Sequence, residues 1–98
     1  MLNETTARRM ALAQVARDQA MARALEDHAE RGALLLAGNG HVRTDLGVPR
    51  WLDAATRARS EAIGVLETGD ETAAYDRRVF SPPQPRKDPC EGMTAPPR

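Results

Sequence analysis

The chain has 98 residues, with 14 basic and 14 acidic side chains, so its formal net charge at pH 7 is zero. Without an excess of positive charge to displace counterions from phosphates, the composition excludes electrostatic nucleic-acid binding as a main activity and argues against a polybasic membrane-binding surface. Hydrophobic residues make up 41% of the chain but aromatic residues only 3%, which indicates one small folded domain with a thin core.

Cysteine usage and the N-terminus limit the class of protein further. The single cysteine, Cys90, excludes an internal disulfide and a multi-cysteine zinc site. The longest purely apolar run, residues 33–37, is too short to span a membrane. The first residues lack the basic and apolar regions of a signal peptide, so the chain as written is expected in the cytoplasm.

Residues 4–31 are predicted to form one long helix, because they contain no glycine or proline and are rich in strong helix formers. Asn3 is a suitable N-cap, and Gly32 is a suitable residue just beyond the C-terminal end. His28 lies near that end, where a cation favours the helix dipole, and we interpret it as a capping residue rather than a ligand.

Asp18 interrupts the apolar stripe of this helix, and two interpretations remain open. If Asp18 is buried, it needs a partner, and it would accept hydrogen bonds from the amides between Gly38 and Gly40 or from His41. If it lies on an exposed face of the helix, it is simply solvated.

The middle of the chain is predicted to alternate between helix and strand. Residues 33–37 are continuously apolar and bounded by glycines, which predicts a strand buried on both faces, as in a parallel sheet. A short helix is expected over residues 50–59, with Pro49 at its first position. Residues 61–67 and 75–80 are predicted as further strands, the last at a sheet edge.

Six of the seven prolines follow Ser81, so an irregular or disordered tail is expected over residues 81–98. The remaining residues, 1–80, are predicted to form an α/β domain. Its sheet would be mixed and incomplete, since two or three short strands beside one long helix do not cover a central strand on both sides.

The residues most suggestive of a binding site follow the apolar run of residues 33–37: Gly38, Asn39, Gly40 and His41. Ligands of open α/β sheets bind at the carboxyl ends of strands, where a neutral imidazole can hold a metal or move a proton. Asn-Gly is also the strongest signal for a type I′ hairpin turn, in which His41 would be an exposed strand residue. The residues alone leave both interpretations open.

Residues 35–43 and 45–52 resemble the ChaN-like family of bacterial haem-binding, iron-regulated proteins. This family belongs to a wider superfamily with a Gly-x-x-His motif, which includes the Tiki proteases and erythromycin-esterase-like proteins. Two more stretches are similar to the family: Arg17-Asp18 followed by Met21-Ala22, which resembles an Arg-Asp-x-x-Met-Ala helix, and Tyr75-Asp76, Val79-Phe80 and Asp88-Pro89-Cys90, which resemble its C-terminal end.

The resemblance implies a truncated chain, the C-terminal part of a longer protein whose full-length relatives are often exported as membrane-anchored lipoproteins. It also implies haem binding for bacterial iron uptake, without enzymatic activity, often between two subunits. The expected partners are haem, a second copy of the chain or the missing N-terminal half.

By the same resemblance, His41 is the expected axial ligand or metal ligand, or makes a hydrogen bond in the pocket, with Gly38, Asn39 and Gly40 beside it. Tyr75 is a second candidate ligand, because tyrosine also binds ferric haem, or it is an ordinary residue of a sheet edge. Arg43 and Arg50 would bind the propionates or lie on solvated surface. Trp51 and Leu52 would form a pocket wall or ordinary core.

Two other functions remain open. The superfamily's proteases and esterases suggest a metal-dependent hydrolase, which would need further His and Glu ligands to complete a metal site. The chain is alternatively a truncated product without independent activity.

Overall fold

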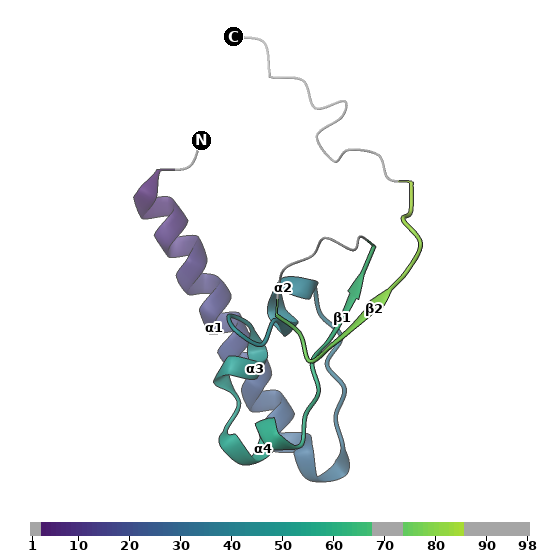
Figure 1. Cartoon of the computed structure of the whole chain (residues 1–98). Helices are drawn as coiled ribbons and strands as arrows, with labels where there is room; N and C mark the ends of the chain where they lie inside the picture. Colours follow the sequence, from purple (N-terminus) through teal and green to yellow (C-terminus); the bar gives the residue numbers. More distant parts are fainter. Residues whose placement is uncertain (1–2, 68–73, 86–98) are drawn as a thin grey trace.

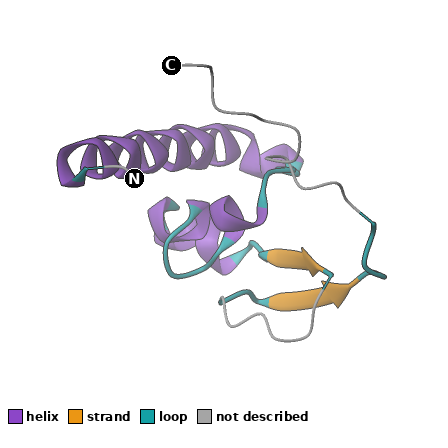
Figure 2. Cartoon of the chain, turned by 90° about the horizontal axis from the view of Figure 1, so that it is seen from above, coloured by secondary structure: helices purple, strands orange, loops and turns teal. Residues whose placement is uncertain are grey.

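A computed structural model of the chain describes residues 3–67 and 74–85 (Figure 1). Two parallel strands form a small open sheet, and with the long helix they make a mixed α/β structure, which confirms the predicted fold class. The elements in chain order are α1 (Glu4–His28), the 3-10 turn η1 (Ala29–Arg31), α2 (Asn39–Val42), α3 (Val48–Trp51), α4 (Ala54–Ala58), β1 (Ile63–Leu66) and β2 (Arg77–Phe80). Figure 2 shows α1 on one side, the strands on the other, and the short helices between them.

The long helix and both of its ends agree with the prediction. Asn3 caps α1, because its side-chain oxygen accepts the backbone N–H of Thr6 at 2.8 Å. Gly32 follows η1 with φ of +84°, a conformation that favours glycine. His28 Nδ1 lies 2.8 Å from the carbonyl oxygen of Ala24, so this imidazole contacts a backbone carbonyl at the end of its own helix. No helix of the described residues is long and apolar enough to cross a membrane.

The predicted buried strand at residues 33–37 is wrong. This segment is irregular, and Leu34 and Leu36 are 94% and 95% exposed. An apolar run has the composition of a buried strand, but a strand also needs a neighbour to pair with its backbone groups. The described residues supply no such neighbour.

The helix predicted over residues 50–59 is divided in two. Pro49 lies in the first turn of α3, as predicted, but the chain becomes extended at Leu52. Asp53 then starts α4: its carboxylate accepts the N–H of Thr56 at 2.7 Å, while its own N–H donates to Glu26 of α1. Because Asp is a strong N-cap, it favours a new helix start over continuation of α3.

Strands β1 and β2 confirm the two strands predicted near the end of the domain, with shorter bounds. They pair in parallel, from Ile63 opposite Arg77 to Leu66 opposite Phe80. Every residue of β2 is exposed, as expected for an edge strand. Gly64 is required by packing, because a Cβ there would lie 2.7 Å from the ring of Tyr75.

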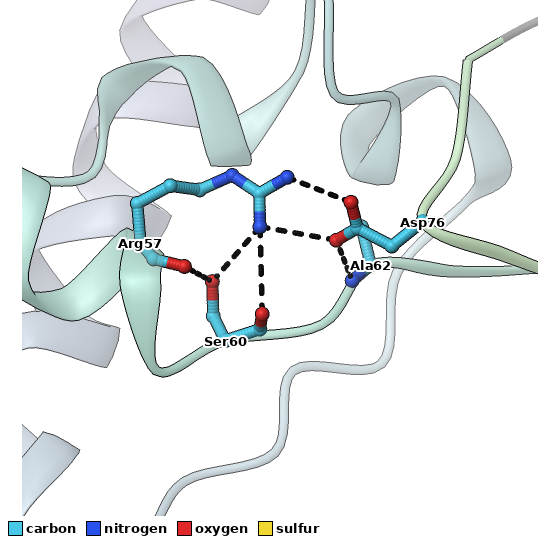
Figure 3. Close-up of polar contacts among 4 residues, drawn as sticks. All are labelled: Arg57, Ser60, Ala62 and Asp76. Atoms are coloured by element: carbon cyan, nitrogen blue, oxygen red, sulfur yellow. Dashed lines mark hydrogen bonds and ion pairs between the residues drawn. The ribbon is translucent and has the colours of Figure 1, made fainter.

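An ion-pair network fixes the start of β2 beside the residue that precedes β1 (Figure 3). The guanidinium of Arg57 donates to both carboxylate oxygens of Asp76, at 3.0 and 2.9 Å. Asp76 also accepts the backbone N–H of Ala62 at 2.7 Å, and Arg57 donates to Ser60. The hydrogen bonds from Arg57 are the main reason that the pKa of Asp76 lies below its ordinary value of 3.8.

The apolar core is as thin as the composition predicts. The buried apolar side chains of the described residues are Ala22, Val48, Ala62 and Leu66. Residues 81–85 form no regular element, and the rest of the predicted tail, with Cys90, lies outside the described residues. The division into a domain and a tail stays a prediction.

Candidate functional site

The centre of the candidate site is a contact between Asp18 of α1 and His41 of α2. The Oδ1 atom of Asp18 lies 2.6 Å from Nδ1 of His41. Asp18 is 5% exposed, whereas the side chain of His41 keeps 27% of its surface exposed. Of the two interpretations of Asp18, the buried residue paired with His41 is therefore right, and the solvated residue is wrong.

His41 lies on a single helical turn, not on the loop or hairpin that Asn-Gly suggests. The carbonyl of Gly38 accepts the N–H of His41 at 2.9 Å and closes the turn. Gly47 packs directly against this turn, because a Cβ there would overlap the backbone carbonyl of His41 and lie 2.9 Å from the carbonyl oxygen of Arg43. The residues that follow the turn therefore pack against its backbone.

The pairing with Asp18 determines which nitrogen of His41 is available. A carboxylate only accepts hydrogen bonds, so the proton of the neutral imidazole belongs on Nδ1 and the lone pair on Nε2. Histidines that bind metals commonly donate their other N–H to a carboxylate in this way, which orients the ring and strengthens the donor. The arrangement is chemically suited to bind iron or another metal at Nε2, or to accept a proton there.

Asn39 and Tyr75 connect the same turn to the sheet. The side-chain amide of Asn39 donates to the carbonyl oxygen of Val65 in β1 at 3.0 Å. The hydroxyl of Tyr75 donates to the backbone carbonyl oxygen of Asn39 at 3.4 Å. The structure therefore brings Asn39, His41 and Tyr75 together around α2, although His41 and Tyr75 are 34 positions apart in sequence.

Arg43 and Arg50, the two predicted propionate ligands, both have partners close in sequence. Arg43 donates to both carboxylate oxygens of Asp45, at 3.0 and 2.8 Å, and these bonds lower the pKa of Asp45. The guanidinium carbon of Arg50 lies 5.4 Å from the centre of the Trp51 ring, a cation–π distance. Trp51 Nε1 is buried and has no hydrogen-bond partner in the described part of the chain.

An apolar groove of about 530 Å³ lies next to α2, within the usual size range of small-molecule sites. Leu52 lines this groove and so does Val42, the residue after His41, whereas Trp51, the other expected wall residue, does not. His41 itself is not among its lining residues. The imidazole of His41 and the part of the groove lined by Val42 therefore belong to neighbouring residues of α2. Sequence reasoning missed Leu25 of α1 as a groove residue.

Within residues 3–67 and 74–85, no group of three or more His, Cys, Asp or Glu side chains is placed to hold a metal ion. The donor set that the structure does assemble is the single imidazole of His41 supported by Asp18.

Comparison with known proteins gives one match. A family model described as haem-binding uptake, Tiki superfamily, ChaN matches residues 1–52, slightly more than half of the chain. Asp18, His41 and all of α1 lie inside the matched region, whereas Tyr75 lies outside it. No curated protein and no solved structure matches the chain.

Proposed function

The chain belongs to the ChaN family of haem-binding uptake proteins in the Tiki superfamily, and we propose that it binds haem with Nε2 of His41 as the axial donor. The observation that carries the proposal is the 2.6 Å contact between His41 and the buried Asp18. It orients the imidazole and keeps the proton on Nδ1, which is what a nitrogen ligand to iron requires.

The surroundings of His41 suit a large flat ligand. A haem site needs a donor, apolar cover and cations for two propionates. Gly38 carries no side chain beside the imidazole, and the apolar groove begins at Val42. Arg43 and Arg50 are the nearest cations in sequence, and each would exchange its present partner for a propionate.

Tyr75, which lies just before β2, is proposed as a second ligand, an oxygen donor beside the same turn. Its hydroxyl already contacts the backbone of Asn39, two residues before His41. Asn39 would act through its bond to Val65, which holds the turn against β1.

The family description, which names haem uptake, supports binding and delivery of haem rather than catalysis. We place the chain in bacterial iron acquisition. A second copy of the chain would extend the open two-stranded sheet. The exposed Leu34 and Leu36 support such a partner.

A titration of ferric haem, followed by absorbance, tests the proposal. The wild-type chain should give a saturable shift of the Soret band, and His41→Ala should weaken binding at least about tenfold. His28→Ala is the matched control, because His28 is the other histidine of the chain and bonds to its own helix. Circular dichroism of all three proteins checks that they are folded.

Equal haem binding by the wild type and His41→Ala would contradict the proposal. Saturable, His41-dependent binding of Zn²⁺ alone, with no Soret shift, would instead favour a metal-dependent hydrolase site.

A further inference from the structure

The glycines of the described residues are present for different reasons, and for two of them neither backbone conformation nor packing supplies a reason. Gly32 has a positive φ of 84°. Gly47 and Gly64 lie against neighbours that leave no room for a Cβ. Gly38 and Gly40, the two glycines before His41, have neither property.

Backbone conformation does not require Gly38. Its φ of −58° and ψ of 150° are open to any residue. It is the N-cap of α2, a position where Ser, Asn or Asp would add a side-chain hydrogen bond, and no such bond exists here. Gly40 lies inside the helical turn, where glycine costs about 0.5–1 kcal/mol relative to alanine.

Internal packing does not require these glycines either. A Cβ on Gly40 would meet no atom of the described residues within 4 Å. A Cβ on Gly38 would have one neighbour, Cδ2 of His41, at 4.0 Å, which is an ordinary contact distance. Alanine therefore fits at both positions.

The atom nearest to a Cβ on Gly38 indicates which space the absence of a side chain leaves open. Cδ2 is the ring carbon bonded to Nε2, whereas Nδ1, on the other side of the ring, is held by Asp18. A side chain longer than alanine at position 38 would extend into the space at the edge of the ring that carries the available nitrogen.

We propose that Gly38 determines which ligands reach His41: the absence of a side chain admits a broad, flat ligand to Nε2. This inference rests on the proposed function, with haem as the flat ligand. Gly38 is a specificity-determining residue that controls access, and it does not bind the iron.

Graded substitutions at position 38 test the inference. Gly38→Ala should bind haem within about threefold of the wild type, and Gly38→Leu should bind it more than about tenfold more weakly. Ala55→Leu is the matched control, because it adds a larger side chain at an exposed position of α4 and should leave haem binding unchanged.

A second measurement separates blocked access from damage to the site. The ¹⁵N resonances of the His41 ring report its tautomer, and Gly38→Leu should keep the wild-type pattern while losing haem. Wild-type affinity in Gly38→Leu would overturn the inference, and so would loss of the tautomer pattern together with binding. If haem binds but His41→Ala binds it equally well, the proposed function fails as well. If His41→Ala loses haem and Gly38→Leu does not, only the role of Gly38 fails.

Discussion

Asp18 and His41 are 23 residues apart in sequence, yet Oδ1 of the first lies 2.6 Å from Nδ1 of the second. The contact joins the middle of α1 to the turn that carries the candidate ligand. Asp18 is also the buried charged residue of the described part of the chain. Loss of this contact therefore affects both the orientation of the imidazole and the packing of α2 on α1.

Substitution of Asp18 tests this relationship directly. Asp18→Asn keeps the shape of the side chain but removes the charge, and its amide can donate to Nδ1 and place the proton on Nε2 instead. We expect haem affinity to fall about 10–100-fold, the usual effect of losing the partner of a metal-binding histidine. Asp27→Asn, an exposed change on the same helix, is the control. Unchanged affinity in Asp18→Asn would show that the carboxylate does not act through His41.

Two glycine substitutions near His41 should have opposite effects on stability. Gly47→Ala places a Cβ against the backbone of His41 and Arg43, which cannot move away as a flexible side chain can, and should cost about 1–3 kcal/mol. Gly40→Ala meets no neighbour in the described residues and should stabilise the chain by about 0.5–1 kcal/mol. Urea denaturation of both variants measures the difference. Equal stabilities would mean that Gly47 is not packed against the turn.

The ion pair between Arg57 and Asp76 predicts how stability changes with pH. The hydrogen bonds from Arg57 lower the pKa of folded Asp76 below its ordinary value of 3.8. A carboxylate of this kind stabilises the fold above its unfolded pKa, and the stabilisation is lost as the pH falls through the lower, folded pKa. Stability should therefore decrease below about pH 4, and Asp76→Asn should decrease less steeply over the same range.

Thermal unfolding between pH 2 and pH 6 checks this expectation. Arg8→Ala is a useful contrast, because its ion pair with Glu4 is highly exposed and should contribute less than about 0.5 kcal/mol. If stability falls equally steeply with decreasing pH in the wild type and in Asp76→Asn, the ion pair between Arg57 and Asp76 does not stabilise the fold.

The exposed leucines of residues 33–37 predict self-association. The irregular segment presents Leu34 and Leu36 almost fully to solvent, and a second copy of the chain would bury them. Leu34→Lys together with Leu36→Lys should leave the free energy of unfolding within about 0.5 kcal/mol of the wild type and abolish concentration-dependent sedimentation. Leu35→Ala, in the half-buried residue between them, should instead lower stability. Monomeric sedimentation of the wild type at all concentrations would contradict the prediction.

Local patterns predicted much of this fold. The absence of glycine and proline, the capping Asn3 and the terminal Gly32 predicted α1 and its ends, because these features act over a few residues. The strands later observed as β1 and β2 were also visible in the sequence. The new helix start at Asp53, which divides the helix expected over residues 50–59, was not predicted.

The errors and the open alternatives all concern long-range partners. An apolar run at residues 33–37 has the same composition whether or not a neighbouring strand exists, so its burial could not be read from the sequence. Asp18 was equally compatible with solvent and with His41, since the choice depends on how α1 packs against a turn more than 20 residues away.

Propensity, capping and composition act over a few neighbouring residues. They predict the long capped helix, the positions of two strands and the thin core, and the motif around His41 points to the family by resemblance. The burial of Asp18 against His41, the contact of Tyr75 with the same turn and the lack of a strand partner for residues 33–37 became known from the tertiary structure. Each of these depends on which surfaces meet in space, and burial and hydrogen bonding are settled only when they do.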